Sequence, residues 1–284
     1  MTSGEPQVPS VAAVARAADE IFAANRATGH VALHVAQSAG RTRRSRVHED
    51  GSLRVRFPNV TDDALEAVIV NTGGGMTGGD RFAVDVRLGA GARLIAGTAA
   101  AEKIYRSTGA DAEMRVRLEL GENAGLAWLP QETILFDRAR LTRRIEVDLA
   151  DCASLVLAEA VIFGRSAMGE TMRGGRFTDH WRVRRAGKLV FADSTRIEGA
   201  VAEKLAAPAA AAGGIAVATV LLAPSADDTL AALRALEFTG EAGISQWNGI
   251  ALTRLVARDG AALRHDLIAV LGALGQRVPR LWLN

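Results

Sequence analysis

Residues 114–120 read Met-Arg-Val-Arg-Leu-Glu-Leu, an alternation of apolar and charged side chains. A period of two puts the apolar side chains on one face of an extended chain, so this stretch predicts a half-buried β-strand. Glycines and other turn-forming residues separate it from similar stretches, with no helical pattern between them. The region from residue 29 to about 199 is therefore expected to form a β-sandwich, barrel or β-solenoid without a fixed repeat length. The other alternating segments are residues 53–57, 82–88 and 145–149.

The sequence changes character after residue 198. Apolar residues at helical spacing predict helices over 227–236 and 261–274. Strands are expected over 215–222 and 248–256, with a loop over the Ala/Pro/Gly-rich segment 206–214. The predicted class is mainly β with two α-helices in the C-terminal part.

The N-terminal 28 residues stand apart from the rest of the chain. They are rich in alanine, and we interpret residues 1–28 as an extension that is helical or disordered, leaving 29–284 as a single domain. A helix that docks on a partner is the less favoured interpretation of this segment.

Composition excludes several classes of protein. The 34 Lys and Arg residues nearly balance 32 Asp and Glu residues, which argues against nucleic-acid binding. A single cysteine, Cys152, excludes an internal disulfide and favours a reducing compartment. No apolar run approaches the roughly 20 residues that cross a bilayer, and no export signal is recognisable. We expect a soluble cytoplasmic protein with no membrane partner.

A glycine-rich stretch at residues 71–80 contains the GxGxxG pattern at Gly73, Gly75 and Gly78. Dinucleotide binding requires that a helix follow these glycines, and here an alternating strand follows. We expect a tight connection in which the backbone is closely approached and Asp80 is presented at a crowded place.

Four further acids lie in or beside apolar stretches. Glu132 and Asp137 flank an apolar run, and Glu159 stands inside the hydrophobic segment 157–163, with Glu170 shortly after it. A carboxylate buried like Glu159 must be paired, hydrogen-bonded, protonated or next to water, and Arg165 is a candidate partner for Glu159. The simpler interpretation is that backbone amides and arginines satisfy each of these acids.

Five blocks of sequence resemble the UreD (UreH) family of urease accessory proteins. They occur in the order and spacing typical of that family and spread over residues 29–284: NTGGGMTGGD (71–80), AAAEKIYRS (99–107), WLPQETILFD (128–137), AEAVIFGRSAMGE (158–170) and PRLWLN (279–284). The resemblance implies a right-handed β-helical or superhelical body with two helices. It also implies a non-enzymatic protein that binds UreF, which recruits the GTPase UreG, and that docks on apo-urease while nickel passes through it.

The metal-binding side chains suit transit of nickel better than storage. None of the five histidines forms a ligand-spaced cluster with Cys152, which we expect to be a small buried residue. His30 and His34 share a strand face and are expected to be exposed. A passage must bind its ion weakly enough to release it, so no tight cofactor is expected and Ni²⁺ is bound transiently. The acids proposed to line the passage are Asp80, Glu132, Asp137, Glu159 and Glu170.

Glu159 is the strongest of these candidates, because burial costs it most if it has no role. Its replacement by alanine is expected to reduce urease activation without loss of UreF binding. Two alternatives remain open from the sequence. One is a docking adaptor through which no nickel passes, and the other is a β-helical glycan-active enzyme that uses two carboxylates as acid and base.

Overall fold

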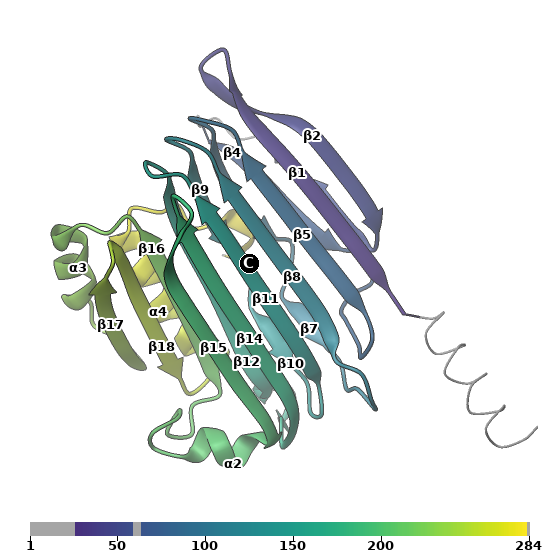
Figure 1. Ribbon diagram of the computed structural model, residues 1–284. Coiled ribbons are helices and arrows are strands. Elements are labelled where there is room, and N and C mark those ends of the chain that lie inside the picture. Colours follow the sequence, from purple (N-terminus) through teal and green to yellow (C-terminus); the bar gives the residue numbers. More distant parts are fainter. Residues whose placement is uncertain (1–25, 59–63, 283–284) are drawn as a thin grey trace, which may run out of the picture.

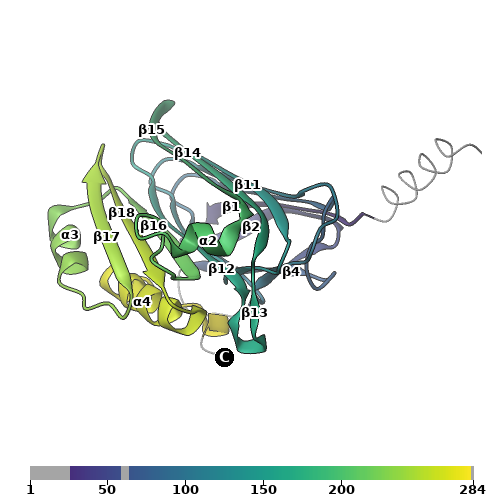
Figure 2. The ribbon, with the colours of Figure 1, turned by 90° about the horizontal axis from the view of Figure 1, so that it is seen from below.

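The computed structural model describes residues 26–58 and 64–282 as two stacked β-sheets with helices at one end (Figures 1 and 2). The first sheet has the strand order β15-β14-β11-β8-β5-β1-β2. Its central strands run parallel, and the edge strands β2 and β15 pair antiparallel with their neighbours. Its strands are β1 (Thr28–Ser38), β2 (Arg41–Gly51), β5 (Arg81–Leu88), β8 (Ala112–Leu120), β11 (Arg140–Leu149), β14 (Gly174–Arg185) and β15 (Lys188–Ala200).

The second sheet follows the order β17-β18-β16-β12-β9-β6-β4-β3, and its middle strands β12, β9, β6 and β4 are parallel. Three short strands, β7, β10 and β13, extend it beside β12. Its main strands are β3 (Leu53–Arg56), β4 (Leu65–Asn71), β6 (Arg93–Thr98), β9 (Gly125–Leu129), β12 (Ser154–Arg165), β16 (Ala216–Ala223), β17 (Glu241–Trp247) and β18 (Ile250–Ala257). The short strands are β7 (Glu102–Ile104), β10 (Thr133–Leu135) and β13 (Glu170–Thr171).

The chain passes repeatedly from one sheet to the other and builds both at once. It runs through β5, β6 and β7, then β8, β9 and β10, then β11 and β12, so that equivalent strands of successive coils lie side by side. This is a solenoid-like β arrangement, which confirms the predicted fold class. Aligned residues such as Val84, Val116, Ile145 and Trp181 are unequally spaced along the chain, which explains why the sequence has no fixed period.

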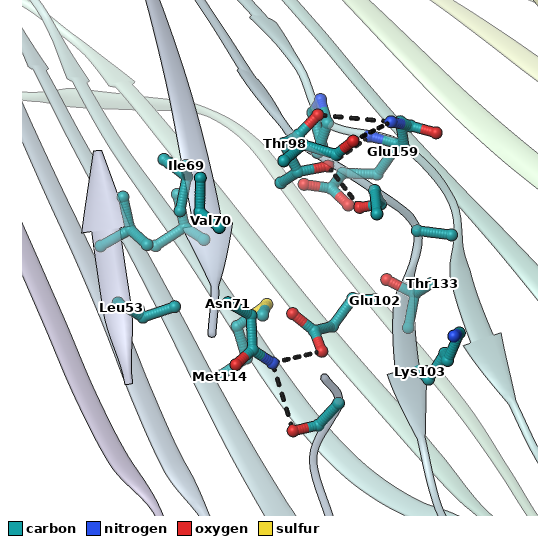
Figure 3. A pocket seen from close by; sticks show the side chains of 18 of the residues that line it. Leu53, Ile69, Val70, Asn71, Thr98, Glu102, Lys103, Met114, Thr133 and Glu159 are labelled. Carbon is teal, nitrogen blue, oxygen red and sulfur yellow. Dashed lines mark hydrogen bonds between the residues drawn. The ribbon is translucent and has the colours of Figure 1, made fainter. Parts of the chain in front are cut away.

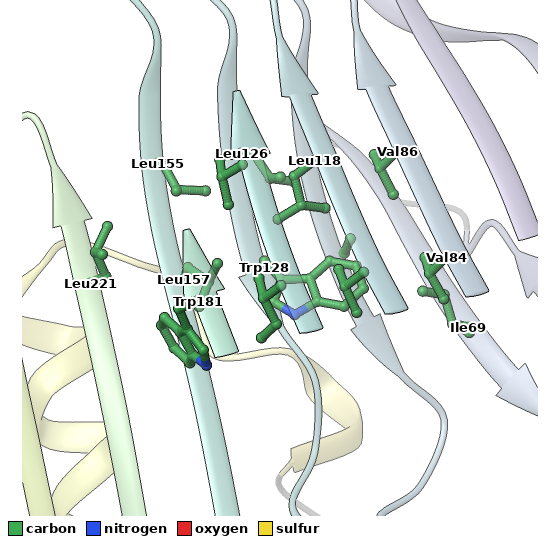
Figure 4. Close-up of a cluster of buried hydrophobic side chains, with 14 of the residues drawn as sticks. Ile69, Val84, Val86, Leu118, Leu126, Trp128, Leu155, Leu157, Trp181 and Leu221 are labelled. Carbon is green, nitrogen blue, oxygen red and sulfur yellow. The ribbon is translucent and has the colours of Figure 1, made fainter. Parts of the chain in front are cut away.

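The core lies between the sheets, where the inward-facing side chains of both layers interdigitate (Figure 4). A second apolar cluster fills the space between the outer face of the second sheet and helix α4. Strand β12 is therefore buried on both faces, which accounts for its nearly unbroken hydrophobic sequence.

Two of the three α-helices in the described part of the chain were predicted from the sequence. Helix α3 (Asp227–Arg234) and helix α4 (Gly260–Ala273) match the expected segments, and the Asp259 carboxylate caps α4 by accepting from Ala262 N at 2.8 Å. The short helix α2 (Val201–Ala206) was not predicted. Two 3₁₀ turns, η1 (Ser166–Met168) and η2 (Arg280–Trp282), complete the described elements.

The strand β2 was also missed, because its sequence RTRRSRVHEDG shows no apolar alternation. As an edge strand with almost every side chain exposed it has no face to bury, and charged side chains are common on such edges. The expected N-terminal extension falls almost entirely on residues 1–25, outside the described residues. No helix in the described ranges has the length and apolarity needed to cross a membrane.

Candidate functional site

The glycine-rich connection between β4 and β5 has the close packing expected from its sequence. Asp80 is 4% exposed and accepts from Ala27 N at 2.8 Å and from Thr77 N at 2.7 Å. Strand β5 begins at the next residue, so no helix follows the glycines and the connection lacks the context of a dinucleotide site. Asp80 therefore fixes the loop to the start of β1.

Two of the other predicted site residues fasten parts of the fold together. Glu132 receives two hydrogen bonds from Arg264 of α4, at 2.8 and 2.6 Å, and so joins the β body to the helix. Arg165 donates to Glu170 at 2.7 and 3.2 Å. The expected pairing of Arg165 with Glu159 is therefore wrong, because Arg165 lies at the end of β12 while Glu159 lies in its middle.

Asp137 accepts its hydrogen bonds from backbone N–H groups, and the Arg173 guanidinium lies 3.6 Å from it. Its Oδ1 accepts from Arg173 N at 2.8 Å and from Gly174 N at 3.2 Å. Burial alone would raise the pKa of Asp137, but these two N–H groups and the Arg173 charge outweigh it and hold the pKa below the usual value. Asp137 thus anchors the turn that leads into β14.

Among the five acids proposed from the sequence to line the passage, Glu159 lies in the core between the sheets, at 6% exposure. Its two carboxylate oxygens accept from the indole Nε1 of Trp128, at 2.8 Å, and from the guanidinium Nη1 of Arg143. Arg143 also donates from Nε and Nη2 to Asp179, at 3.0 and 2.6 Å, and Asp179 accepts from Trp181 Nε1 at 2.9 Å. We call Arg143, Glu159 and Asp179 the buried triad.

The triad links the two sheets. Arg143 on β11 and Asp179 on β14 are direct partners in the first sheet, and Glu159 projects from β12 of the second. Burial raises the pKa of Glu159, opposed by the Arg143 charge and the Trp128 hydrogen bond. The two carboxylates outweigh desolvation at Arg143 and raise its pKa, so the guanidinium is cationic.

Two cavities lie between the sheets and both reach Glu159. Cavity 1, of about 190 Å³, extends from Glu159 and Trp128 toward the glycine-rich connection at Gly74 (Figure 3). Cavity 2, of about 370 Å³, extends from the triad toward β15, β16 and β18. Each includes an exposed residue in its lining, Lys103 for cavity 1 and Arg254 for cavity 2. Asp80, Glu132, Asp137 and Glu170 line neither of these two cavities.

Glu102 on β7 is a cavity 1 residue that sequence analysis did not single out. It accepts from Asn71 Nδ2 at 2.8 Å, and Figure 3 shows both side chains at the wall of the cavity. Burial raises the pKa of Glu102 to about 7, against the lowering effect of the Asn71 hydrogen bond. Its charge therefore changes near neutral pH.

Glutamine in place of Glu102 is expected to raise the free energy of unfolding at pH 8 by on the order of 2 kcal/mol. The folded-state pKa of Glu102 is about 7, whereas its ordinary value is 4.5. Between these pH values the folded protein binds more protons on this group than the unfolded chain does, so its stability falls as pH rises from 4.5 to 7. Glutamine keeps an acceptor for Asn71 and carries no charge. Urea denaturation at pH 8 and pH 5 measures the effect, and a difference of equal size at both pH values contradicts it.

The histidines and the cysteine differ from expectation in two places. In residues 26–58 and 64–282, no three His, Cys, Asp or Glu side chains are grouped to hold a metal ion. His30 is half-buried and its Nε2 lies 2.7 Å from Asp85 Oδ2. Cys152 is exposed, so its prediction as a buried residue is wrong, because it lies in the turn after β11 and not in a strand.

Arg143 and Asp179 were missed although the sequence carries a signal for both. In β11 the inward positions read Leu141, Arg143 and Ile145, and in β14 Asp179 stands between Phe177 and Trp181 on the inward face. Each is the one charged residue in an apolar stripe of period two. This pattern marks each of the three residues as unusual, but it does not show that they pair with one another.

Comparison with known proteins identifies the family. A family model described as UreD urease accessory protein matches residues 27–283. The chain belongs to this family. A relative named "Urease accessory protein UreD" from Rhodopseudomonas palustris (strain HaA2) is 56% identical over 267 residues, covering 93% of this chain and 96% of its own. One of the same name from Bradyrhizobium diazoefficiens (strain USDA 110) is 52% identical over 266 residues, with the same two coverages.

The family prediction made from the five sequence blocks is confirmed. The protein is a urease accessory protein, and the accessory role in the family description agrees with the expected non-enzymatic function. Three of the five sequence blocks, 71–80, 99–107 and 128–137, also contact one another in the structure. Tyr105 donates to Gly74 O at 2.9 Å, and its ring packs edge-on against Phe136 with centroids 5.0 Å apart.

Proposed function

We propose that this chain conducts Ni²⁺ to apo-urease in the cytoplasm, as a non-enzymatic subunit that works with UreF and, through UreF, with the GTPase UreG. The observation that carries the proposal is the meeting of the two cavities at Glu159. Together they extend through the space between the sheets from the wall at Lys103 to the wall at Arg254. Nickel is the cargo of this passage and not a resident cofactor.

The chemistry of the lining suits transient binding. Nickel in a site built from several imidazoles or thiolates is held tightly, whereas isolated carboxylates and water bind it weakly enough for release. Glu102 lies in cavity 1 and Asp193 in cavity 2. Between them Glu159 and Asp179 share the Arg143 guanidinium at the junction. This arrangement supports stepwise movement between weak sites.

The geometry narrows the set of acids proposed for the passage. Glu159 remains the central residue, joined by Glu102 and Asp179. Asp80, Glu132, Asp137 and Glu170 each have a partner that accounts for their position in the fold. For these four we propose a structural role in holding the loops and α4 around the passage.

Obstruction of cavity 1 tests the conduit. Thr133 on β10 is buried and lines this cavity, so a phenylalanine there is expected to fill much of its volume (Figure 3). Thr133→Phe is expected to lower the nickel content and activity of urease matured with UreF and UreG at limiting nickel by about tenfold or more, equivalent to at least 1.4 kcal/mol. Nickel is measured in the recovered urease by mass spectrometry.

Thr133→Val is the matched control, because valine has nearly the shape of threonine and leaves the cavity open. Both variants must be recovered with UreF in equal amount, which shows that folding and docking are intact. If Thr133→Phe assembles normally and loads urease as well as the control, the docking-adaptor alternative is correct and the conduit is rejected.

A further inference from the structure

The Arg143 guanidinium lies at the junction of the two cavities. Its side chain is 1% exposed, and it is held between two carboxylates: Nη1 donates to Glu159, and Nε and Nη2 donate to Asp179 at 3.0 and 2.6 Å. Glu159 lines both cavities, whereas Arg143 and Asp179 line cavity 2. A cation that moves from one cavity to the other past Glu159 therefore comes next to this guanidinium.

Fold stability alone gives little reason for a charged group here. A buried ion network replaced by well-packed apolar residues often leaves stability unchanged or raises it, because the charges must be desolvated. The neighbouring inward positions on these strands are already apolar, for example Leu141 and Ile145 beside Arg143. Leucine-sized side chains would suit this layer of the core equally well.

We infer that Arg143 is the gate of the passage: its guanidinium occupies, between Glu159 and Asp179, the position that a divalent cation takes in transit, and the ion crosses by exchanging with it. This inference rests on the proposed conduit function. Both carboxylates already bind one cationic group at hydrogen-bond distance, so an ion in its place is within reach of both.

Charge explains why the gate favours a divalent ion. One guanidinium balances the charge of one of the two carboxylates, whereas a divalent cation there balances both. A monovalent cation in the same place gains no charge compensation over the guanidinium that it displaces. The gate therefore stays closed to Na⁺ and K⁺ and opens to Ni²⁺.

The displaced guanidinium has a place to go. Cavity 2 adjoins it, and the face of the Phe177 ring lies 5.7 Å from Arg143 Cζ. Asp193 is a further carboxylate in the lining, where it accepts from Arg254 at 2.7 Å. A guanidinium is more weakly hydrated than an ammonium and stacks on aromatic faces, so this move is less unfavourable for arginine than for lysine. Arg143 can leave the junction without leaving the protein.

Vacating the gate provides the first test. Untagged Arg143→Met presents two carboxylates with no cation between them, so saturating Ni²⁺ is expected to raise its Tm by about 5 °C or more, with a much smaller change in the wild type. The rise must disappear in Arg143→Met/Glu159→Gln, which has one carboxylate at the junction. K⁺ at equal ionic strength must not reproduce it. An Arg143→Met variant whose Tm does not respond to Ni²⁺ overturns the inference.

A neutral variant keeps the inference testable if Arg143→Met does not fold at neutral pH. Arg143→Met/Glu159→Gln/Asp179→Asn has no charge at the junction and nearly conserved volume. A gate predicts that this variant binds UreF but loads nickel into urease at least about tenfold less well, whereas a purely structural triad predicts normal loading. Normal loading by the neutral variant, together with a block by Thr133→Phe, rejects the gate and leaves the conduit intact. Normal loading by Thr133→Phe rejects the conduit itself.

Discussion

Arg143→Met is expected to lower the free energy of unfolding by about 3–5 kcal/mol at pH 8 in the absence of divalent metal. Among residues 26–58 and 64–282, its guanidinium is the one cationic group that hydrogen-bonds to Glu159 and to the buried Asp179. Without it, two carboxylates face each other in the core, and the indoles of Trp128 and Trp181 supply only neutral hydrogen bonds. Urea denaturation followed by tryptophan fluorescence measures the loss.

The loss is expected to shrink as the pH falls. Burial raises the pKa of Glu159 even in the wild type, where Arg143 opposes it, and removal of Arg143 removes that opposition. A carboxyl whose folded-state pKa lies above its unfolded value destabilises the fold progressively as pH rises between the two. Near pH 4.5, where the unfolded chain also takes up protons, the variant should approach the wild type.

Glu159→Gln is the matched control for this prediction. It leaves Arg143 paired with Asp179 as a neutral ion pair and keeps an acceptor for the Trp128 indole, so a loss of only about 1 kcal/mol is expected. Equal losses for the two substitutions, or a loss for Arg143→Met that is independent of pH, would show that packing and not charge holds this part of the core.

The alternation of apolar residues predicted the strands but not their order. Segments such as 82–88, 114–120 and 145–149 became β5, β8 and β11, because a half-buried strand has a pattern of period two whatever its neighbours are. Loop lengths differ from coil to coil, and they decide which strands pair. Val84 lies beside Val116 for this reason. Local pattern carries no information on that choice, which the family resemblance supplied.

The candidate site was predictable only one residue at a time. Glu159 stood out as an acid in a hydrophobic run, and its burial was correctly inferred. Its partner could not be read from sequence spacing, because Arg143 lies on the opposing sheet and meets Glu159 only when the layers stack. The bond from Arg264 to Glu132 likewise joins α4 to a distant loop. Long-range pairs of this kind require the folded topology.

Gly75 lines cavity 1 at a position where other atoms already fill the space that a Cβ would take. Gly75 has φ of 149°, and a Cβ built on it would lie 2.4 Å from the Tyr105 ring and 2.7 Å from the carbonyl oxygen of Lys103. The Tyr105 ring is held by its hydrogen bond to Gly74 O and by its edge-on contact with the Phe136 ring. Lys103 O belongs to the backbone of β7. Lys103 O cannot move aside without displacing β7, which carries Glu102, whereas the Tyr105 ring can turn away only by giving up these two contacts.

Gly75→Ala is therefore expected to lower the free energy of unfolding by about 3 kcal/mol or more, from backbone strain and overpacking together. Gly74→Ala is the matched control, because its φ is also positive, at 75°, but nothing lies within 4 Å of the added Cβ. That variant should lose only about 1–2 kcal/mol, from conformation alone. Urea denaturation measures the free energy of unfolding of both variants. Equal losses would mean that the Tyr105 ring moves aside at little cost.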